Sequence, residues 1–136
     1  IVVRRQRQMC IRDSIYERLR FEAPIEVIPA ITGMSAAWTA TGLPITWGDN
    51  ILTILTGTLS KEVLVDKIST TDAAVIMKVG QNLDKIRAAI ILAERESDAF
   101  IVEYAAMSNQ SVCKLVEYTK AVAPYFSIIV LHGEAK

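Results

Sequence analysis

The sequence has few of the side chains that enzymes commonly use for acid–base or metal chemistry. It contains one histidine, His132, and two cysteines, Cys10 and Cys113, which stand far apart and form no Cys-x-x-Cys or Cys/His spacing. This spacing indicates no zinc site, and no metal-ligating residues are predicted. We expect both cysteines to be free thiols in a reducing compartment. A single histidine at the end of a strand is expected to be structural or solvated.

The chain also lacks a net charge and a long apolar run. Fifteen basic residues balance fifteen acidic ones, so no overall charge favours nucleic acid or a membrane surface as a partner. No apolar run reaches the roughly 18 residues of a membrane helix, and arginines follow the apolar start in the reverse order of a secretory signal. At 136 residues and 51% hydrophobic content, the sequence predicts one folded, soluble, cytoplasmic domain.

The first thirteen residues differ from the rest in charge. Four arginines, Arg4, Arg5, Arg7 and Arg12, stand here against one acidic residue, Asp13. The segment has no clear hydrophobic period, so little burial can depend on it. We expect residues 1–13 to be a non-native or disordered tail and residues 14–136 to be the domain. The alternative is a solvated, basic helix start.

From residue 14 onward, helical and strand patterns alternate, which is typical of an α/β layered fold. A serine before the third helix, Ser60, is placed as an N-cap. The strand near residue 111 is expected at a sheet edge. The expected helices are 15–21, 35–40, 61–68 and 83–93, and the expected strands are 26–28, 51–55, 73–77, 100–102, 111–115 and 125–131.

Catalytic signatures are missing as well. The chain has no Gly-x-Ser-x-Gly, His-Glu-x-x-His or P-loop motif, and Gly42, Gly48 and Gly57 do not form a phosphate-binding fingerprint. The residues alone therefore indicate an α/β domain and no reaction.

Several blocks, taken in order, resemble the tetrapyrrole (corrin/porphyrin) methylase family, in particular its precorrin-2 methylating branch. The likeness runs from about Ser14 to Gly133. The blocks are EVIPAITGMSAA at 26–37, GLP at 42–44, ILTILTGTL at 51–59, DAAVIMKVGQNL at 72–83, EYAAMSNQ at 103–110 and PYFS at 124–127.

This resemblance implies a fold and an activity. It implies the C-terminal α/β lobe of the two-lobed methylase fold, a mixed sheet flanked by helices, with the N-terminal lobe absent. The implied activity is S-adenosylmethionine-dependent methyl transfer to a ring carbon of precorrin-2, or of its cobalt form, in cobalamin biosynthesis. The lobe alone is expected to be inactive, and the full-length protein is expected to be a homodimer with no nucleic-acid or membrane partner.

The resemblance also implies a set of cofactor-binding residues, and no catalytic residue. The implied S-adenosylmethionine contacts are Thr32, Gly33, Met77, Ala105 and Tyr125. Considered without the family, Met77 is a core residue and Thr32 is a turn or helix-capping residue. Thr32, Met77, Ala105 and Tyr125 are expected to line one open face of the sheet, because one small ligand must contact them all.

Alternatives of two kinds remain open. The chain could belong to another branch of the family, of the precorrin-4 or uroporphyrinogen type, or more distantly resemble diphthine synthase. It could also be a non-catalytic α/β interaction domain whose basic arm, with Arg4, Arg5 and Arg7, binds an acidic partner.

Overall fold

The computed structural model describes residues 11–134, and for residues 11–13 the backbone only. The predicted tail at 1–13 thus lies mostly outside the described residues. The elements are α1 (Ile11–Leu19), α2 (Gly33–Ala40), β1 (Leu52–Thr56), α3 (Lys61–Ser69), β2 (Ala73–Met77), η1 (Gly80–Asn82), α4 (Leu83–Leu92), η2 (Glu96–Asp98), β3 (Ala99–Glu103), β4 (Ser111–Lys114), η3 (Leu115–Glu117) and β5 (Ser127–Leu131).

A five-stranded mixed sheet in the order β1-β2-β5-β3-β4 forms the centre of the fold. Strands β1 and β2 run parallel, whereas β5 lies between β2 and β3 and runs antiparallel to both. Strand β4 pairs only with β3 and closes one edge, as predicted. The α/β fold with a mixed sheet flanked by helices is therefore confirmed.

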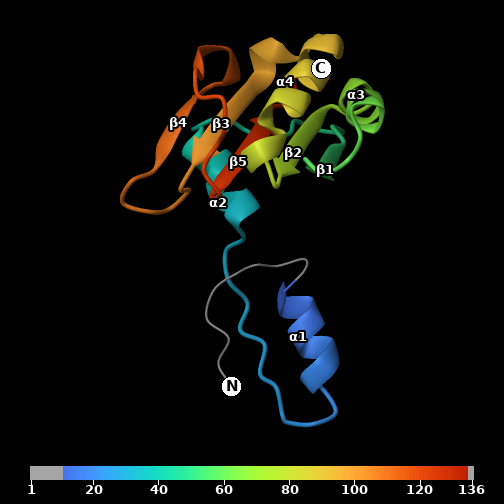
Figure 1. Ribbon diagram of the computed structural model, residues 1–136, viewed down its shortest axis with the longest axis vertical. Coiled ribbons are helices and arrows are strands. Elements are labelled where there is room, and N and C mark those ends of the chain that lie inside the picture. The colour runs from blue at the N-terminus through green and yellow to red at the C-terminus, as the bar shows by residue number, and fades with distance from the viewer. Residues whose placement is uncertain (1–10, 135–136) are drawn as a thin grey trace.

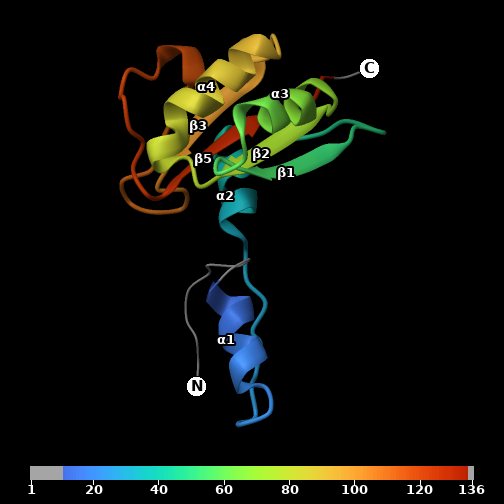
Figure 2. The same ribbon diagram turned by 45° about the vertical axis from the view of Figure 1, so that its right-hand side comes forward.

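Helices cover both faces of the sheet. Figures 1 and 2 show α3 and α4 on one face and α2 on the other. The α3/α4 face carries the larger core, which includes Ile68, Ile76, Ile90 and Ile129, all fully buried. The α2 face carries a smaller core, centred on Ala37, Val102 and Val130.

Two predicted capping positions are present in the structure. The amide of Val63 donates to Ser60 Oγ at 3.3 Å, which confirms Ser60 as the N-cap of α3. The amide of Ser35 donates to Thr32 Oγ1 at 3.1 Å, so Thr32 caps α2. Each hydroxyl satisfies an amide that has no partner within its helix.

The expected strand at 26–28 is wrong. The backbone has no regular structure there, and Val27 and Ile28 are exposed at 52% and 63%. A strand needs a neighbour to accept its backbone hydrogen bonds, and none of the strands within residues 11–134 lies beside this segment. The segment instead links α1, which both views show apart from the sheet, to α2 (Figures 1 and 2).

His132 follows β5 and is buried, so of the two expected roles, structural or solvated, the structure shows the structural one. Its Nδ1 lies 2.8 Å from the carbonyl oxygen of Pro44, and its ring packs edge-on against Phe100 with centroids 5.4 Å apart.

Within residues 11–134, no helix is long and apolar enough to cross a membrane.

Candidate functional site

Strand register places several strand ends along one edge of the sheet. Thr56 pairs with Met77 at the ends of β1 and β2, and Glu103 pairs with Ser127 where β3 ends and β5 begins. Because β5 is antiparallel to β2 and β3, its first residues lie beside the last residues of those strands. We call this edge, where β1, β2 and β3 end, the carboxyl edge. Ligands of open α/β sheets bind at such an edge.

Met77 is the last residue of β2 and is half-buried. Ala74 and Ile76 belong to the α3/α4 core, and side chains alternate along a strand, so Met77 lies on the α2 face. Its carbonyl accepts a hydrogen bond of 2.7 Å from the amide of Gly57, in the turn that follows β1. Two adjacent turns are thereby joined at the carboxyl edge.

Thr32 and Gly33 begin α2 on the same face. A Cβ atom on Gly33 would lie 3.7 Å from Cδ1 of Ile128, the second residue of β5. The last pair between β2 and β5 is Ile76 with Ile129, so the same register places Ile128 opposite Met77. The start of α2 therefore lies at the carboxyl edge, over the strand next to Met77.

Ala105 and Tyr125 come from the two connections that flank β3 and β5. Ala105 follows β3 by two residues and packs against the α2-face core. Tyr125 precedes β5 by two residues, is 69% exposed, and contacts Phe126 edge-on with ring centroids 5.1 Å apart. All five predicted residues thus lie at the carboxyl edge, as the expectation of one shared site requires. Their binding of a cofactor stays a prediction.

The comparison with known proteins settles the family. The profile of the tetrapyrrole (corrin/porphyrin) methylases matches residues 11–119. The chain belongs to the tetrapyrrole methylases. The matched segment contains Thr32, Gly33, Met77 and Ala105, whereas Tyr125 lies beyond it.

Curated methylase relatives extend the likeness. The chain is 43% identical over 119 residues to a Sinorhizobium precorrin-2 C(20)-methyltransferase, covering 88% of this chain and 49% of the relative. It is 36% identical over 114 residues to the Mycobacterium tuberculosis cobalamin biosynthesis protein CobIJ, covering 84% of this chain and 22% of that protein. The chain thus spans about half or less of the curated relatives that it matches.

Solved methylase structures share the fold at low sequence identity. A cobalt precorrin-4 methyltransferase aligns with a TM-score of 0.70 at 16% identity, over 90% of this chain and 57% of that one. A uroporphyrin-III C-methyltransferase from Thermus thermophilus, complexed with S-adenosylhomocysteine, aligns with a TM-score of 0.57 at 20% identity. That alignment covers 87% of this chain and 57% of the Thermus chain. These likenesses establish the tetrapyrrole methylase fold.

The residues at the carboxyl edge fit the chemistry of an adenosine-containing sulfonium. Gly33 has no side chain, and a Cβ atom there would make only an ordinary contact of 3.7 Å with Cδ1 of Ile128 among the described residues outside its own helix, so a ligand can approach the backbone there. Met77 offers a polarisable thioether, and Tyr125 offers an exposed ring with a polar tip. This combination suits a ligand that has an aromatic base, a ribose and a methylsulfonium group.

Three residues at the carboxyl edge have a left-handed backbone conformation, which the sequence did not predict. Lys78, Tyr104 and Ala106 have φ angles of 55°, 52° and 61°. Lys78 follows Met77 directly, and Ala105 lies between the other two. Such conformations are costly for residues with a side chain and gather at functional sites. No sequence signal reveals them, because glycine, asparagine and aspartate are the residues that usually adopt this region.

A buried carboxylate lies at the carboxyl edge on the α3/α4 face. Glu103 accepts hydrogen bonds from the Tyr118 hydroxyl and from Lys120 Nζ, the latter at 2.9 Å to each carboxylate oxygen. Burial opposes ionisation of Glu103, but these two donors outweigh it and lower its pKa. Burial and the neighbouring carboxylate raise the pKa of Tyr118. The Glu103 carboxylate therefore stays ionised beside the Lys120 ammonium, and the cluster fastens the 115–120 segment to β3.

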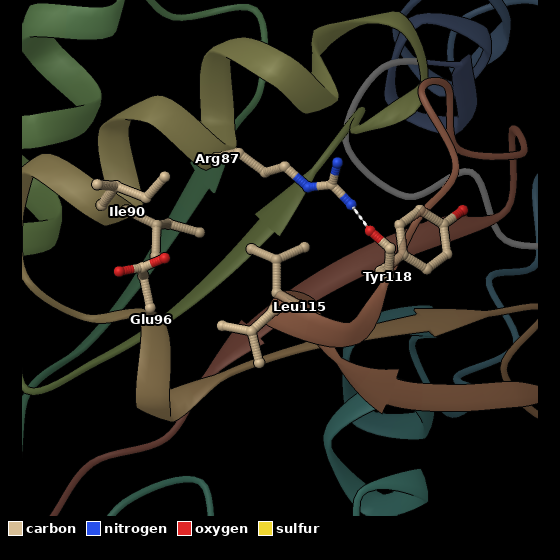
Figure 3. A pocket seen from close by; sticks show the side chains of 7 residues that line it. Arg87, Ile90, Glu96, Leu115 and Tyr118 are labelled. Carbon is tan, nitrogen blue, oxygen red and sulfur yellow. Dashed lines mark hydrogen bonds between the residues drawn. The ribbon is translucent and has the colours of Figure 1, made fainter.

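A separate hollow of about 240 Å³ lies between α4 and η3. Figure 3 shows Ile90 and Leu115 on its walls, with Arg87 reaching the main-chain carbonyl of Tyr118 and Glu96 on the other side. None of the five predicted cofactor residues lines this hollow. It is therefore distinct from the carboxyl edge.

Proposed function

We propose that this chain forms one wall of the S-adenosylmethionine site of a cytoplasmic methyltransferase that acts on precorrin-2, or its cobalt form, in cobalamin biosynthesis. The observation that carries the proposal is the convergence of Thr32, Gly33, Met77, Ala105 and Tyr125 at the carboxyl edge. The 43% identity to a precorrin-2 C(20)-methyltransferase supports this choice of substrate.

The chain's own residues would act by holding the cofactor in place and enclosing it. The cofactor supplies a methyl group already activated by its sulfonium. The carboxyl edge then has to fix its orientation and exclude water, which apolar side chains and backbone groups can do. Met77 and Ala105 would contact the cofactor from adjacent turns. The N-terminus of α2, with Thr32 and Gly33, would limit the site on the α2 face.

We infer that the opposite wall comes from a second lobe, since the chain spans about half of the Sinorhizobium relative. With one wall alone the donor is not enclosed, and a misplacement of about 1 Å can already lower a rate about 100-fold. We therefore expect no turnover of precorrin-2 by this chain alone. Homodimer formation of the full-length enzyme is part of the same proposal.

The test is a chimera in which this chain replaces the matching half of the Sinorhizobium enzyme. We expect the chimera to methylate precorrin-2 and to leave precorrin-4 and uroporphyrinogen III unchanged. A folded chimera that methylates either of the other two tetrapyrroles would reassign the chain to another branch. A folded chimera without any methylation, or turnover by the chain alone, would contradict the proposal.

A further inference from the structure

Lys78 and Ala106 have left-handed backbone at the carboxyl edge, and each is held by a hydrogen bond to a side-chain carboxamide. Asn82 Nδ2 donates to the carbonyl of Lys78 at 3.0 Å, and Gln110 Oε1 accepts from the amide of Ala106 at 2.7 Å. In both turns, a side-chain carboxamide four residues downstream holds the backbone of a residue with positive φ. The two turns follow β2 and β3, the strands on either side of β5.

Around Met77, the hydrogen bond from Asn82 acts together with a close approach between two turns of the backbone. The Met77 carbonyl accepts from Gly57, and the next carbonyl, that of Lys78, accepts from Asn82. A Cβ atom on Gly57 would lie 2.7 Å from this second oxygen, so only glycine lets the two turns come so close. Both carbonyls that follow the strand are thus fixed.

Around Ala105, the second turn is held at three places. The amide of Tyr104 donates to the Phe126 carbonyl at 2.7 Å, and the amide of Met107 donates to the Tyr104 carbonyl at 2.9 Å. Gln110 accepts from Ala106. Ala105 therefore lies between two left-handed residues whose conformations are tied from both sides.

The remaining left-handed residue with a side chain, among those described, serves as an internal comparison. Glu94 has φ 56° just after α4, away from the carboxyl edge. Its own amide donates to Ile91 at 3.0 Å and that of Arg95 to Ile90 at 3.1 Å, the backbone pattern that ordinarily ends a helix. No carboxamide takes part, so this use of a side-chain carboxamide is confined to the two turns at the carboxyl edge.

We infer that Asn82 and Gln110 are positioning residues: they lock the two turns that present Met77 and Ala105 to the cofactor. The inference rests on the proposed function for the identity of the ligand. Strained conformations persist only where the surroundings over-determine them, and here the half-buried Asn82 and the exposed Gln110 supply that constraint. A ligand that meets a wall already fixed in shape loses less entropy on binding.

The experiment observes labelled methionine and alanine methyl groups by NMR: the ligand-free spectra use the full chain, and the spectra with S-adenosylhomocysteine use the chimera with the Sinorhizobium lobe, which supplies the second wall. The variants are Asn82→Ala and Gln110→Ala, each alone and combined with Lys78→Gly or Ala106→Gly respectively. Matched controls are Gln81→Ala and Asn109→Ala, which remove adjacent exposed carboxamides that make no hydrogen bond within residues 11–134.

Without ligand, we expect Asn82→Ala to shift or broaden the Met77 methyl signal and Gln110→Ala that of Ala105. With ligand, each variant should bind about tenfold more weakly, because the wall moves. The paired glycine should restore the methyl signal and bring the affinity to within about threefold of the parent, since glycine adopts positive φ without strain. A general loss of stability would not be repaired in this way.

Three outcomes would overturn the inference: unchanged methyl signals in the alanine variants, no rescue by glycine, or equal effects from the control substitutions. Absence of any ligand-induced shift in the parent chimera would instead contradict the cofactor role of the carboxyl edge, and with it the proposed function. The ligand-free spectra would then still decide whether the carboxamides hold the two turns.

Discussion

Arg95 and Asp98 form a partly buried ion pair, with Nε 2.6 Å from Oδ2 and side chains only 19% and 17% exposed. The same guanidinium donates to the carbonyls of Thr71, Asp72 and His132. It therefore joins the start of β2 to the end of β5, at the edge of the sheet opposite the carboxyl edge. One side chain thus satisfies three main-chain oxygens where strands begin and end.

Arg95→Lys should lower the free energy of unfolding by about 2–4 kcal/mol, because a lysine cannot reproduce the planar fork and leaves buried carbonyls unsatisfied. Urea denaturation measures the change. Arg20→Lys is the control, since its ion pair with Glu17 is exposed and should contribute about 0–1 kcal/mol. Equal effects of the two substitutions would show that the Arg95 network adds little.

Glu103→Gln should make the protein less stable at neutral pH, by about 1–3 kcal/mol, and less sensitive to acid. The fold lowers the pKa of Glu103 below its usual 4.5, so the unfolded chain binds its proton first as the pH falls. The stability that this carboxylate contributes is present above pH 4.5 and is lost as the pH falls through the lowered pKa. Unfolding curves at pH 7 and pH 3.5 test this, and an unchanged acid response in the variant would contradict it.

Gly57→Ala should destabilise the fold by about 1–3 kcal/mol, because the added Cβ would lie 2.7 Å from the Lys78 carbonyl and 2.8 Å from Cδ1 of Ile86. Gly33→Ala is the matched control, since its Cβ would make only an ordinary contact of 3.7 Å. Thermal melting should separate the two variants by several degrees. Equal melting temperatures would mean that the turn after β1 relaxes freely.

Glu94→Gly should stabilise the protein by about 0.5–1 kcal/mol. The residue ends α4 at φ 56°, where glycine has no steric cost, and this gain exceeds the entropy that glycine adds to the unfolded chain. Glu96→Gly, in the neighbouring turn at ordinary φ, should not stabilise. Chemical denaturation of both variants is the measurement, and a loss of stability in Glu94→Gly would be the contrary result.

A chain beginning at Ser14 should melt within a few degrees of the full chain. Residues 1–13 have charge without an apolar face in their sequence, so we expect little burial to depend on this segment. Differential scanning calorimetry compares the two chains. A drop of ten degrees or more would show that the segment packs on the domain.

The elements that local sequence predicted well are those with an unambiguous pattern. The continuous apolar run at 73–77 became β2 with the same bounds, and the apolar stripe from Leu83 became α4. The short apolar triplet at 26–28 failed because strand formation depends on a neighbour, which is absent there. The last strand begins at Ser127, two residues later than predicted, because Tyr125 and Phe126 are exposed before the pairing starts.

The residues of the candidate site were predicted from the family resemblance. The residues that support them, Asn82 and Gln110, were not predicted. Met77 and Thr32 each have an ordinary structural explanation, and only the sheet register brings their elements to one edge. The carboxamides of Asn82 and Gln110 matter because of backbone angles at Lys78 and Ala106, and those angles depend on tertiary contacts between turns. Local propensity has no access to such contacts.

The position of β5 has a consequence for how the protein is made. This strand is the last of the described strands in sequence order but occupies the middle of the sheet, between β2 and β3. During synthesis, the four earlier strands can form only two separate pairs, each with an open edge, until residues 127–131 leave the ribosome. Completion of the sheet is therefore a late, long-range event, and until then the nascent chain exposes unpaired strand edges that are prone to aggregation.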